Sequence, residues 1–265
     1  MLVHPAFDPI ALQLGPLKIH WYGLMYLLGF YGCWWLGTRR ARLAHFNWPR
    51  ERVSDLLFYI VLGVILGGRI GYTLFYNFPA FMAEPMVLLR MWEGGMSFHG
   101  GLLGVIVAFF WFARTHGVRV FEVADFVAPL IPFGLLTGRI GNFINAELWG
   151  APTSLPWGMV FPGAGPEPRH PSMLYEAALE GVVLLAVLWW FGRQPRPAPA
   201  VAGLFLVLYA VFRSAVEFVR LPDAHIGYLY GTSWFTMGML LCVPMFIAGV
   251  LLMTWAYRRP AIRPA

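Results

Sequence analysis

The sequence has little charge and almost no cysteine. Of its 265 residues only 12% are Asp, Glu, Lys or Arg, whereas an average soluble domain has about 25%. Hydrophobic residues make up 59%, which excludes an ordinary water-soluble globule, a disordered chain and a nucleic-acid-binding protein. The two cysteines, Cys33 and Cys242, lie far apart in apolar runs. They predict buried thiols, because neither a disulfide framework nor a metal cluster can be built from them.

Motifs of several enzyme classes are also missing. The chain has no His-x-x-x-His or His-Glu-x-x-His pattern, so a metal-dependent hydrolase has little support. It has no Gly-x-Ser-x-Gly elbow of a serine hydrolase either. The first eighteen residues lack the basic region and the cleavage site of a signal peptide, so we expect the first apolar segment to be retained.

Long apolar segments recur along the chain. A hydrocarbon core needs about 20 residues of helix, and seven segments approach this length: 20–37, 54–75, 97–113, 121–142, 173–191, 200–219 and 231–256. They predict an all-α polytopic integral membrane protein with about seven transmembrane helices, folded as one membrane-embedded domain over 1–265. Residues 144–172, rich in Pro and Gly, predict an irregular outer cap rather than a further helix.

The basic residues predict the orientation, and the net charge of +6 reflects basic loops at one membrane face. With seven spans, twelve Lys and Arg lie in loops on one side and four lie on the other. Basic loops stay in the cytoplasm, so we expect the N-terminus outside and the C-terminus inside. Three further arginines, Arg69, Arg139 and Arg213, fall within the apolar segments.

An arginine inside a membrane costs at least about 2.5–3.5 kcal/mol, so each of these needs a partner or a ligand. Arg139 shares a helical face with Asn142. Arg213 belongs to a polar stripe at helical spacing, which consists of Tyr209, Arg213, Glu217 and Arg220. One interpretation is a purely structural pairing of Arg with Glu. If Glu217 neutralises Arg213, however, Arg139 and Arg220 have no evident counter-charge, which favours an anionic ligand such as a phospholipid headgroup.

Glycine patterns and histidines complete the candidate features. Gly63, Gly67 and Gly71 repeat at the four-residue spacing that lets membrane helices approach closely. His99 lies between two glycine pairs and supplies a proton acceptor near neutral pH. By itself, however, a single histidine of this kind is more often a hydrogen-bonded structural residue, and the same holds for His20 and His170.

Several stretches together resemble the bacterial phosphatidylglycerol:prolipoprotein diacylglyceryl transferases. They are His20–Tyr26, Gly67–Tyr72, Gly94–Gly101, Gly138–Asn145, Arg169–Ser172, Glu217–Arg220 and Trp255–Arg259. The resemblance implies a seven-helix enzyme of the bacterial inner membrane with an outward N-terminus, a small periplasmic head and no metal or organic cofactor. It further implies that the diacylglyceryl group of phosphatidylglycerol moves onto the lipobox cysteine of a preprolipoprotein signal peptide, which forms a thioether and releases glycerol phosphate.

The resemblance also implies roles for single residues. Arg139 matches the position that binds phosphatidylglycerol, and Arg213 matches a second essential arginine. Other positions that matter in the family correspond to Tyr22, His99, Asn142, Glu147, Tyr209, Glu217 and Arg220. A free thiol has a pKa of about 8.5, so we hypothesise that His99 accepts its proton while Arg139 and Arg213 stabilise the departing phosphate. An alternative is that His99 only shapes the pocket.

The residues alone leave three other functions open. Seven spans with charges inside the membrane also suit a transporter or channel. A phospholipid-binding protein without turnover would use the same arginines. A phospholipid phosphatase would differ only in using water instead of a thiol as the acceptor.

Overall fold

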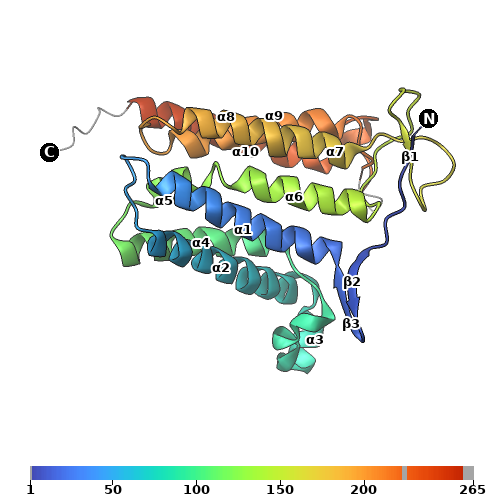
Figure 1. The fold of residues 1–265 in the computed structure, drawn as a ribbon, viewed down its shortest axis with the longest axis horizontal. Coiled ribbons are helices and arrows are strands. Elements are labelled where there is room, and N and C mark those ends of the chain that lie inside the picture. Colours follow the sequence, from blue (N-terminus) through green and yellow to red (C-terminus); the bar gives the residue numbers. More distant parts are fainter. Residues whose placement is uncertain (1, 223–225, 259–265) are drawn as a thin grey trace. The chain divides into compact units, whose positions relative to one another are not determined.

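Each of the seven apolar segments forms helix in the computed structural model, which describes residues 2–222 and 226–258 (Figure 1). The main helices are α1 (Trp21–Ala41), α2 (Arg50–Tyr76), α4 (Phe98–His116), α5 (Val120–Val127), α6 (Ile131–Ile144), α7 (Ser172–Glu176), α8 (Leu184–Phe191), α9 (Ala200–Glu217) and α10 (Met237–Arg258). The π-helical turn η3 (Ala177–Val183) joins α7 to α8 without a break. The predicted helical character is confirmed.

Five helices of the described chain are long and apolar enough to cross a membrane, or six if α5 and α6, bent by 43°, form one broken span. The break between α5 and α6 includes Pro129, and Pro132 lies in the first turn of α6. Proline has no backbone N–H to donate to a preceding helical turn, which explains why the helix is interrupted here. Helix α1 is not among the five, since its Tyr, Trp and Gly residues lower its mean hydropathy. The polytopic membrane character is therefore confirmed, whereas the number seven remains a prediction.

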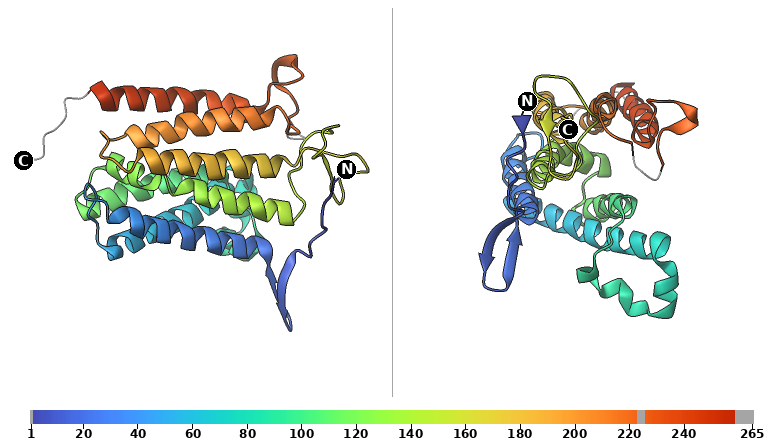
Figure 2. Two further views of the ribbon diagram at one scale, coloured as in Figure 1. Left: turned by 45° about the horizontal axis from the view of Figure 1, so that its top comes forward. Right: turned by 90° about the vertical axis from the view of Figure 1, so that its right-hand side faces the viewer.

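The chain folds as two units. The first consists of Met1–Gly37 and Asp125–Ala265, and the second of Thr38–Ala124. In the first unit, α8 and α9 and then α9 and α10 pack side by side (Figure 2). The apolar core between α8 and α9 includes Leu184, Leu188 and Val201. Oδ1 of Asp125 accepts a hydrogen bond from the backbone N of Ala202, 2.7 Å away, which satisfies an open donor in the first turn of α9.

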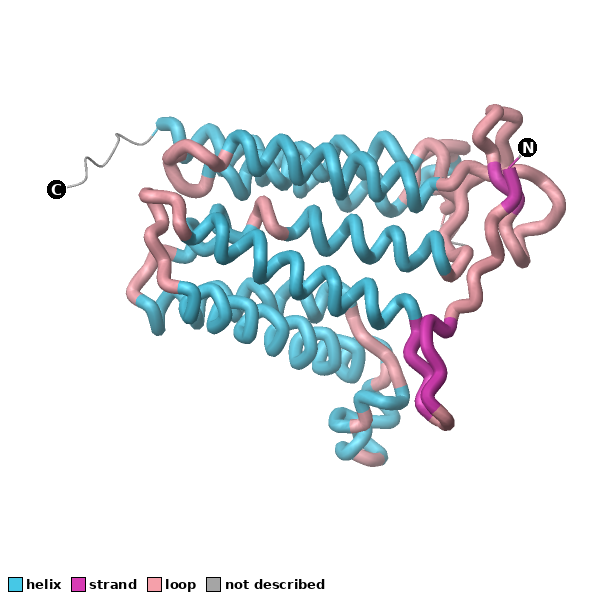
Figure 3. Tube along the Cα trace, viewed as in Figure 1, coloured by secondary structure: helices cyan, strands magenta, loops and turns pink. Residues whose placement is uncertain are grey.

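Short strands depart from the expected all-α architecture, and both pairs belong to the first unit (Figure 3). Strand β1 (Leu2–Val3) pairs in parallel with β4 (Met159–Val160), which lies between α6 and α7. Strands β2 (Ile10–Leu14) and β3 (Leu17–His20) form an antiparallel hairpin directly before α1. Gly15 at its tip has φ +59°, a backbone conformation that glycine adopts without steric cost. Residues 145–171 contain no helix.

The second unit is built on close packing of α2 against α4. A Cβ atom on Gly104 would lie 1.9 Å from the carbonyl oxygen of Gly63, and one on Gly67 would lie 2.3 Å from that of Gly100. The predicted role of the glycine repeat in helix packing is confirmed. Three short helices connect α2 to α4: α3 (Phe78–Ala83), η1 (Pro85–Leu89) and η2 (Met91–Glu93).

Both cysteines are free, with Cys242 buried and Cys33 half-buried. Arg259 and Arg263, which contribute to the predicted charge bias, lie outside the described residues.

Candidate functional site

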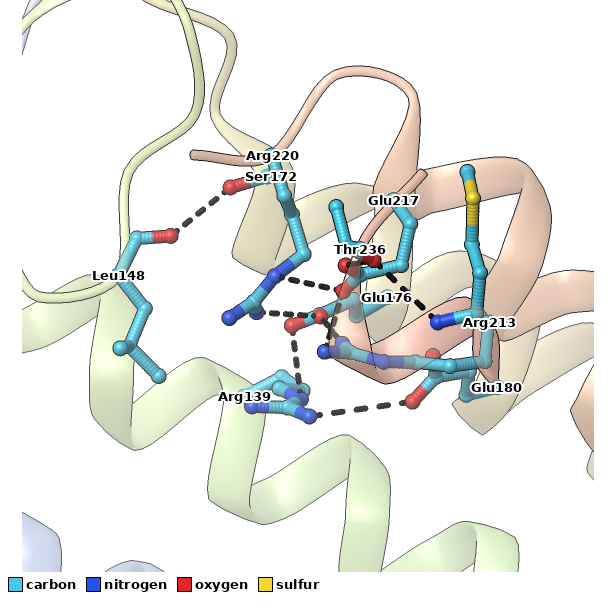
Figure 4. A network of polar contacts seen from close by, with 10 residues as sticks. Arg139, Leu148, Ser172, Glu176, Glu180, Arg213, Glu217, Arg220 and Thr236 are labelled. Atoms are coloured by element: carbon cyan, nitrogen blue, oxygen red, sulfur yellow. Dashed lines mark hydrogen bonds and ion pairs between the residues drawn. The ribbon is translucent and has the colours of Figure 1, made fainter. Parts of the chain in front are cut away.

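Three arginines and three glutamates meet in the first unit (Figure 4). Arg139 projects from α6, and Arg213 projects from α9. The other members are Glu176 from the end of α7, Glu180 from η3, Glu217 from the end of α9 and Arg220 three residues further on. Helices α6, α7 and α9 therefore each contribute a charge to what we call the Arg–Glu cluster.

Glu176 is the centre of the Arg–Glu cluster. Its Oε2 lies 2.9 Å from Nε of Arg139, and its Oε1 accepts from Nη1 of Arg220 at 2.7 Å. Oε1 also accepts from Nη1 of Arg213. The side chain is fully buried. One carboxylate thus holds all three guanidinium groups in place, in surroundings where ion pairs are strong.

Glu217 forms a second point of attachment. Its Oε1 lies 2.5 Å from Nη2 of Arg213 and 3.1 Å from Nε of Arg220. Thr236 donates its hydroxyl to Oε2. Gly238 leaves room for this carboxylate, because a Cβ there would lie 2.8 Å from its Cδ. The orientation of Arg213 and Arg220 is therefore fixed from two sides.

Glu180 is held more loosely. Its Oε2 lies 3.9 Å from Nη2 of Arg139, and neither of its oxygens accepts a hydrogen bond within the described residues. The residue is fully buried and lies in η3. π-helical turns within α-helices frequently occur at functional sites, and this one carries a carboxylate into the Arg–Glu cluster.

The cluster corrects one expectation from the sequence. Arg139 and Arg220 do have counter-charges, because Glu176 contacts both, so the argument from unpaired guanidinium groups is wrong. The sequence-based prediction of the site did not include Glu176 and Glu180, although they are spaced four residues apart in the apolar segment 173–191. The free-energy cost of a charge inside a membrane applies to carboxylates as it does to arginines. Two glutamates within an apolar segment therefore predict a functional or paired site, as the arginines do.

The accessible side of the cluster is nevertheless cationic. The side chains of Arg139, Arg213 and Arg220 are 20%, 16% and 13% exposed, whereas that of Glu176 is 0% exposed. The exposed edges of the three guanidinium groups are available to an anion, while the buried carboxylates hold the guanidinium planes in fixed positions.

Three further predicted residues lie close to Arg139. Asn142 and Glu147 follow it in the sequence, and Tyr22 packs next to Gly141 on the same helix. Tyr22 of α1 packs on α6, with its Cδ2 3.0 Å from where a Cβ of Gly141 would be. Nδ2 of Asn142, which is buried, lies 3.4 Å from Oε2 of Glu147. Glu147 is exposed beyond the end of α6, and its backbone N donates to the carbonyl of Asn142 at 2.9 Å. The Asn142 amide is thereby oriented next to the arginine-bearing face.

Tyr209 lies one helical turn before Arg213 on α9, as the predicted stripe requires. Its ring stacks on Phe205 with centroids 5.8 Å apart, and it packs against the apolar core between α8 and α9. It is half-buried.

The histidines have different surroundings. His99 belongs to the second unit, in the first turn of α4, and its side chain is exposed. His170 precedes α7 in the first unit, and its Nδ1 lies 3.2 Å from the hydroxyl of Tyr175, which accepts a hydrogen bond from Trp157. Partial burial lowers the pKa of His170. His20 ends β3 and is exposed.

No three His, Cys, Asp or Glu side chains of the described residues are arranged to hold a metal ion. The site consists instead of fixed guanidinium groups backed by buried carboxylates, set among helices apolar enough to cross a membrane. This combination defines a polytopic membrane protein with a charged site inside its helices, suited to a ligand that is both anionic and lipidic.

Comparison with known proteins narrows this class. The family model described as prolipoprotein diacylglyceryl transferase matches residues 9–255. A phosphatidylglycerol–prolipoprotein diacylglyceryl transferase of Pseudomonas paraeruginosa is 58% identical over 264 residues, which cover 100% of this chain and 99% of the relative. Proteins of the same name from Azotobacter vinelandii and Methylococcus capsulatus are 59% and 57% identical and cover 98% of this chain each. The chain belongs to the prolipoprotein diacylglyceryl transferase family.

Proposed function

We propose that this chain transfers the diacylglyceryl group of phosphatidylglycerol to the lipobox cysteine of a preprolipoprotein, the first step of bacterial lipoprotein maturation. The name shared by relatives of 57–59% identity supports this reaction. The observation that carries it is the Arg–Glu cluster, whose accessible side is formed by arginines and whose buried side is formed by carboxylates. A phosphodiester is the anion that such a guanidinium surface binds best.

The reaction forms one C–S bond and breaks one C–O bond. The cysteine sulfur attacks the glycerol carbon that carries the phosphodiester, and glycerol phosphate leaves with the bonding electrons. Arg139 and Arg213 bind the phosphate and stabilise the negative charge that grows on the leaving oxygen. Because Glu176 already fixes both side chains, little reorganisation is needed when that charge develops, which is the condition for effective electrostatic catalysis.

The thiol must lose its proton before or during the attack. We propose His99 as the acceptor, since its exposed side chain stands in the first turn of α4 and a neutral imidazole can accept a proton. General-base catalysis of this kind contributes about 10²–10⁴-fold. If His99 only shapes the pocket, replacement by Gln leaves turnover nearly normal across pH.

The remaining site residues are assigned to substrate binding. Arg220 extends the cationic surface, and Glu217 orients Arg213. We assign Tyr22, Asn142 and Glu147 to the headgroup side of Arg139, and Tyr209 to the acyl side, where it meets the apolar core.

In this proposal both units belong to one catalytic domain with seven spans, including α1 and the broken pair α5–α6. The enzyme resides in the bacterial inner membrane, with the N-terminus and the cap at residues 144–172 outside and the C-terminus in the cytoplasm. The aromatic residues of α1 are compatible with a span, because Trp and Tyr are enriched at membrane interfaces.

The test is a mass-spectrometric assay of the purified protein with phosphatidylglycerol and a lipobox peptide, run beside the same peptide with Ser in place of Cys. The expected result is a diacylglyceryl adduct on the cysteine peptide only, with release of glycerol phosphate. Lipid binding without any adduct would instead support a binding protein, transport of lipid in proteoliposomes would support a transporter, and hydrolysis without peptide would support a phosphatase.

A further inference from the structure

Arg69 is an intramembrane arginine that the proposed mechanism does not use. It lies on α2 in the second unit and is only 3% exposed. Each of its five N–H groups has a backbone carbonyl as partner. Nε donates to Leu88 at 3.0 Å, Nη1 donates to Gly94 and, at 3.3 Å, to Gly95, and Nη2 donates to Val87 and, at 2.8 Å, to Arg90.

This carbonyl cage leaves no donor for a ligand. Arg69 therefore differs from Arg139, although both occur in the tetrapeptide Gly-Arg-Ile-Gly. The charge of Arg69 is compensated by carbonyl dipoles, and its contacts hold the chain from Val87 to Gly95 against α2. A planar guanidinium with five donors suits this task, whereas an ammonium group has three donors around one atom.

The caged segment leads directly into helix α4. Gly94 and Gly95 have φ of +76° and +82°, and the ring of Tyr72 occupies the space that a Cβ of Gly95 would fill, 2.3 Å away. Two residues later, the backbone N of Ser97 donates to the carbonyl of Gly68 at 2.9 Å. The turn is thus tied to α2 on both sides of Arg69.

Ser97 is also the N-cap of α4. Its Oγ accepts a hydrogen bond from the backbone N of Gly100 at 3.2 Å, and it is buried. An N-cap fixes the direction in which a helix starts, and His99 is the second residue of this helix. Contacts from Arg69 to Gly95 and from Gly68 to Ser97 therefore define where the His99 backbone begins.

We infer that Arg69 is a positioning residue for His99, which it places through the carbonyl cage and the turn at Gly94–Ser97. The inference rests on the proposed role of His99 as proton acceptor. It predicts that Arg69 affects turnover without affecting lipid binding, because the phosphate-binding arginines belong to the other unit. A displacement of about 1 Å at a catalytic group lowers turnover by about 100-fold.

The first experiment compares Arg69→Lys with Arg90→Lys. Arg90 lies in the same loop, but its side chain pairs with the half-exposed Glu84, a pairing that Lys can also make. For Arg69→Lys we expect kcat to fall about 100-fold, an unchanged KM for phosphatidylglycerol, and faster amide hydrogen exchange over residues 87–97. Arg90→Lys should match the wild type in all three. Wild-type kcat in Arg69→Lys, with or without faster exchange, would overturn the inference.

A double-mutant cycle separates positioning from a merely structural role. If Arg69 acts through His99, then Arg69→Lys in a His99→Gln background should lower turnover no further than about twofold. Full additivity of the two losses would mean that Arg69 acts independently of His99, and would overturn the inference. Near-normal turnover of His99→Gln alone would instead show that the proposed role of His99 fails.

A third variant disturbs the same turn while leaving Arg69 intact. In Gly95→Ala, a methyl group would meet the Tyr72 ring at positive φ, so this variant should reproduce the kcat loss of Arg69→Lys. Gly117→Ala is its control, because Gly117 has φ +64° at the other end of α4 and open space around it. Equal kcat in the two glycine variants would contradict the positioning role of the turn.

Discussion

At the level of single residues, Glu176 is the side chain on which the Arg–Glu cluster depends. We expect Glu176→Gln to lower stability by about 3–5 kcal/mol, because it leaves buried guanidinium groups without their shared carboxylate. The matched control is Glu122→Gln, since Glu122 forms a half-exposed pair with Arg119 that contributes about 0–1 kcal/mol. Thermal unfolding in detergent measures both. Equal midpoints for the two variants would show that the cluster is not a major source of stability.

Arg139 supplies the second prediction at this scale. Its Nε is held by Glu176 and its side chain is 20% exposed, so a single ammonium group in Lys cannot keep the carboxylate contact and bind a phosphate at once. We expect Arg139→Lys to lose about 100- to 1000-fold in kcat, the usual effect of removing one donor from a developing anion. Arg114→Lys, at an exposed position in the last turn of α4, is the control. The adduct assay measures both, and near-normal turnover of Arg139→Lys would contradict the phosphate-binding role.

The sequence predicted the arginines of the site better than its carboxylates. Arg139 stands out as a charge inside an apolar segment, and Arg213, Glu217 and Arg220 stand out as charges at helical spacing; the structure brings them together. Which carboxylate meets which arginine is a matter of how α6, α7 and α9 pack, and that packing has no signature within one helix. Glu176 was detectable as an intramembrane charge, but its pairing with all three arginines was not.

At the level of elements, the glycine contact between α2 and α4 is the closest helix packing in the second unit. Gly104→Ala should destabilise the protein by about 1–3 kcal/mol, since its Cβ would lie 1.9 Å from the Gly63 carbonyl oxygen. Gly134→Ala is the matched control in α6, where nothing lies within 4 Å of the added methyl group. The difference between the unfolding midpoints of the two variants measures this loss of stability. If Gly104→Ala were as stable as Gly134→Ala, α2 and α4 could move apart without a cost in free energy, and the prediction would be wrong.

The elements that the sequence failed to predict are short or irregular. Strands β1 and β4 have two residues each and are far apart in sequence, so neither has a detectable alternation. The hairpin β2–β3 and the short helices α3, η1 and η2 were too brief to separate from loops. The π-helical turn at Ala177–Val183 lies in an apolar run that reads as ordinary helix, because a π-helix is defined by its hydrogen bonds and not by composition.

At the level of the whole molecule, the proposed orientation predicts which loops face the cell exterior. In a parent with both native cysteines replaced, Ser154→Cys should react with a membrane-impermeant maleimide in intact spheroplasts, and Ala44→Cys should not. Both positions are exposed in the structure, so a difference reports the side of the membrane. Permeabilised spheroplasts, in which both must react, are the control. Labelling of both sites in intact spheroplasts would contradict the predicted topology.

The order of synthesis has a consequence for the Arg–Glu cluster. The ribosome completes α6 before α7 and η3, and these before α9, so Arg139 enters the membrane ahead of every carboxylate it contacts. A nascent chain that ends at α8 holds Glu176 and Glu180 against a single guanidinium. The three positive and three negative charges of the cluster are all present only after Arg220 has been synthesised. A chain that stops short of α9 therefore carries an uncompensated carboxylate among apolar helices, which makes the unfinished protein costly to hold in the membrane.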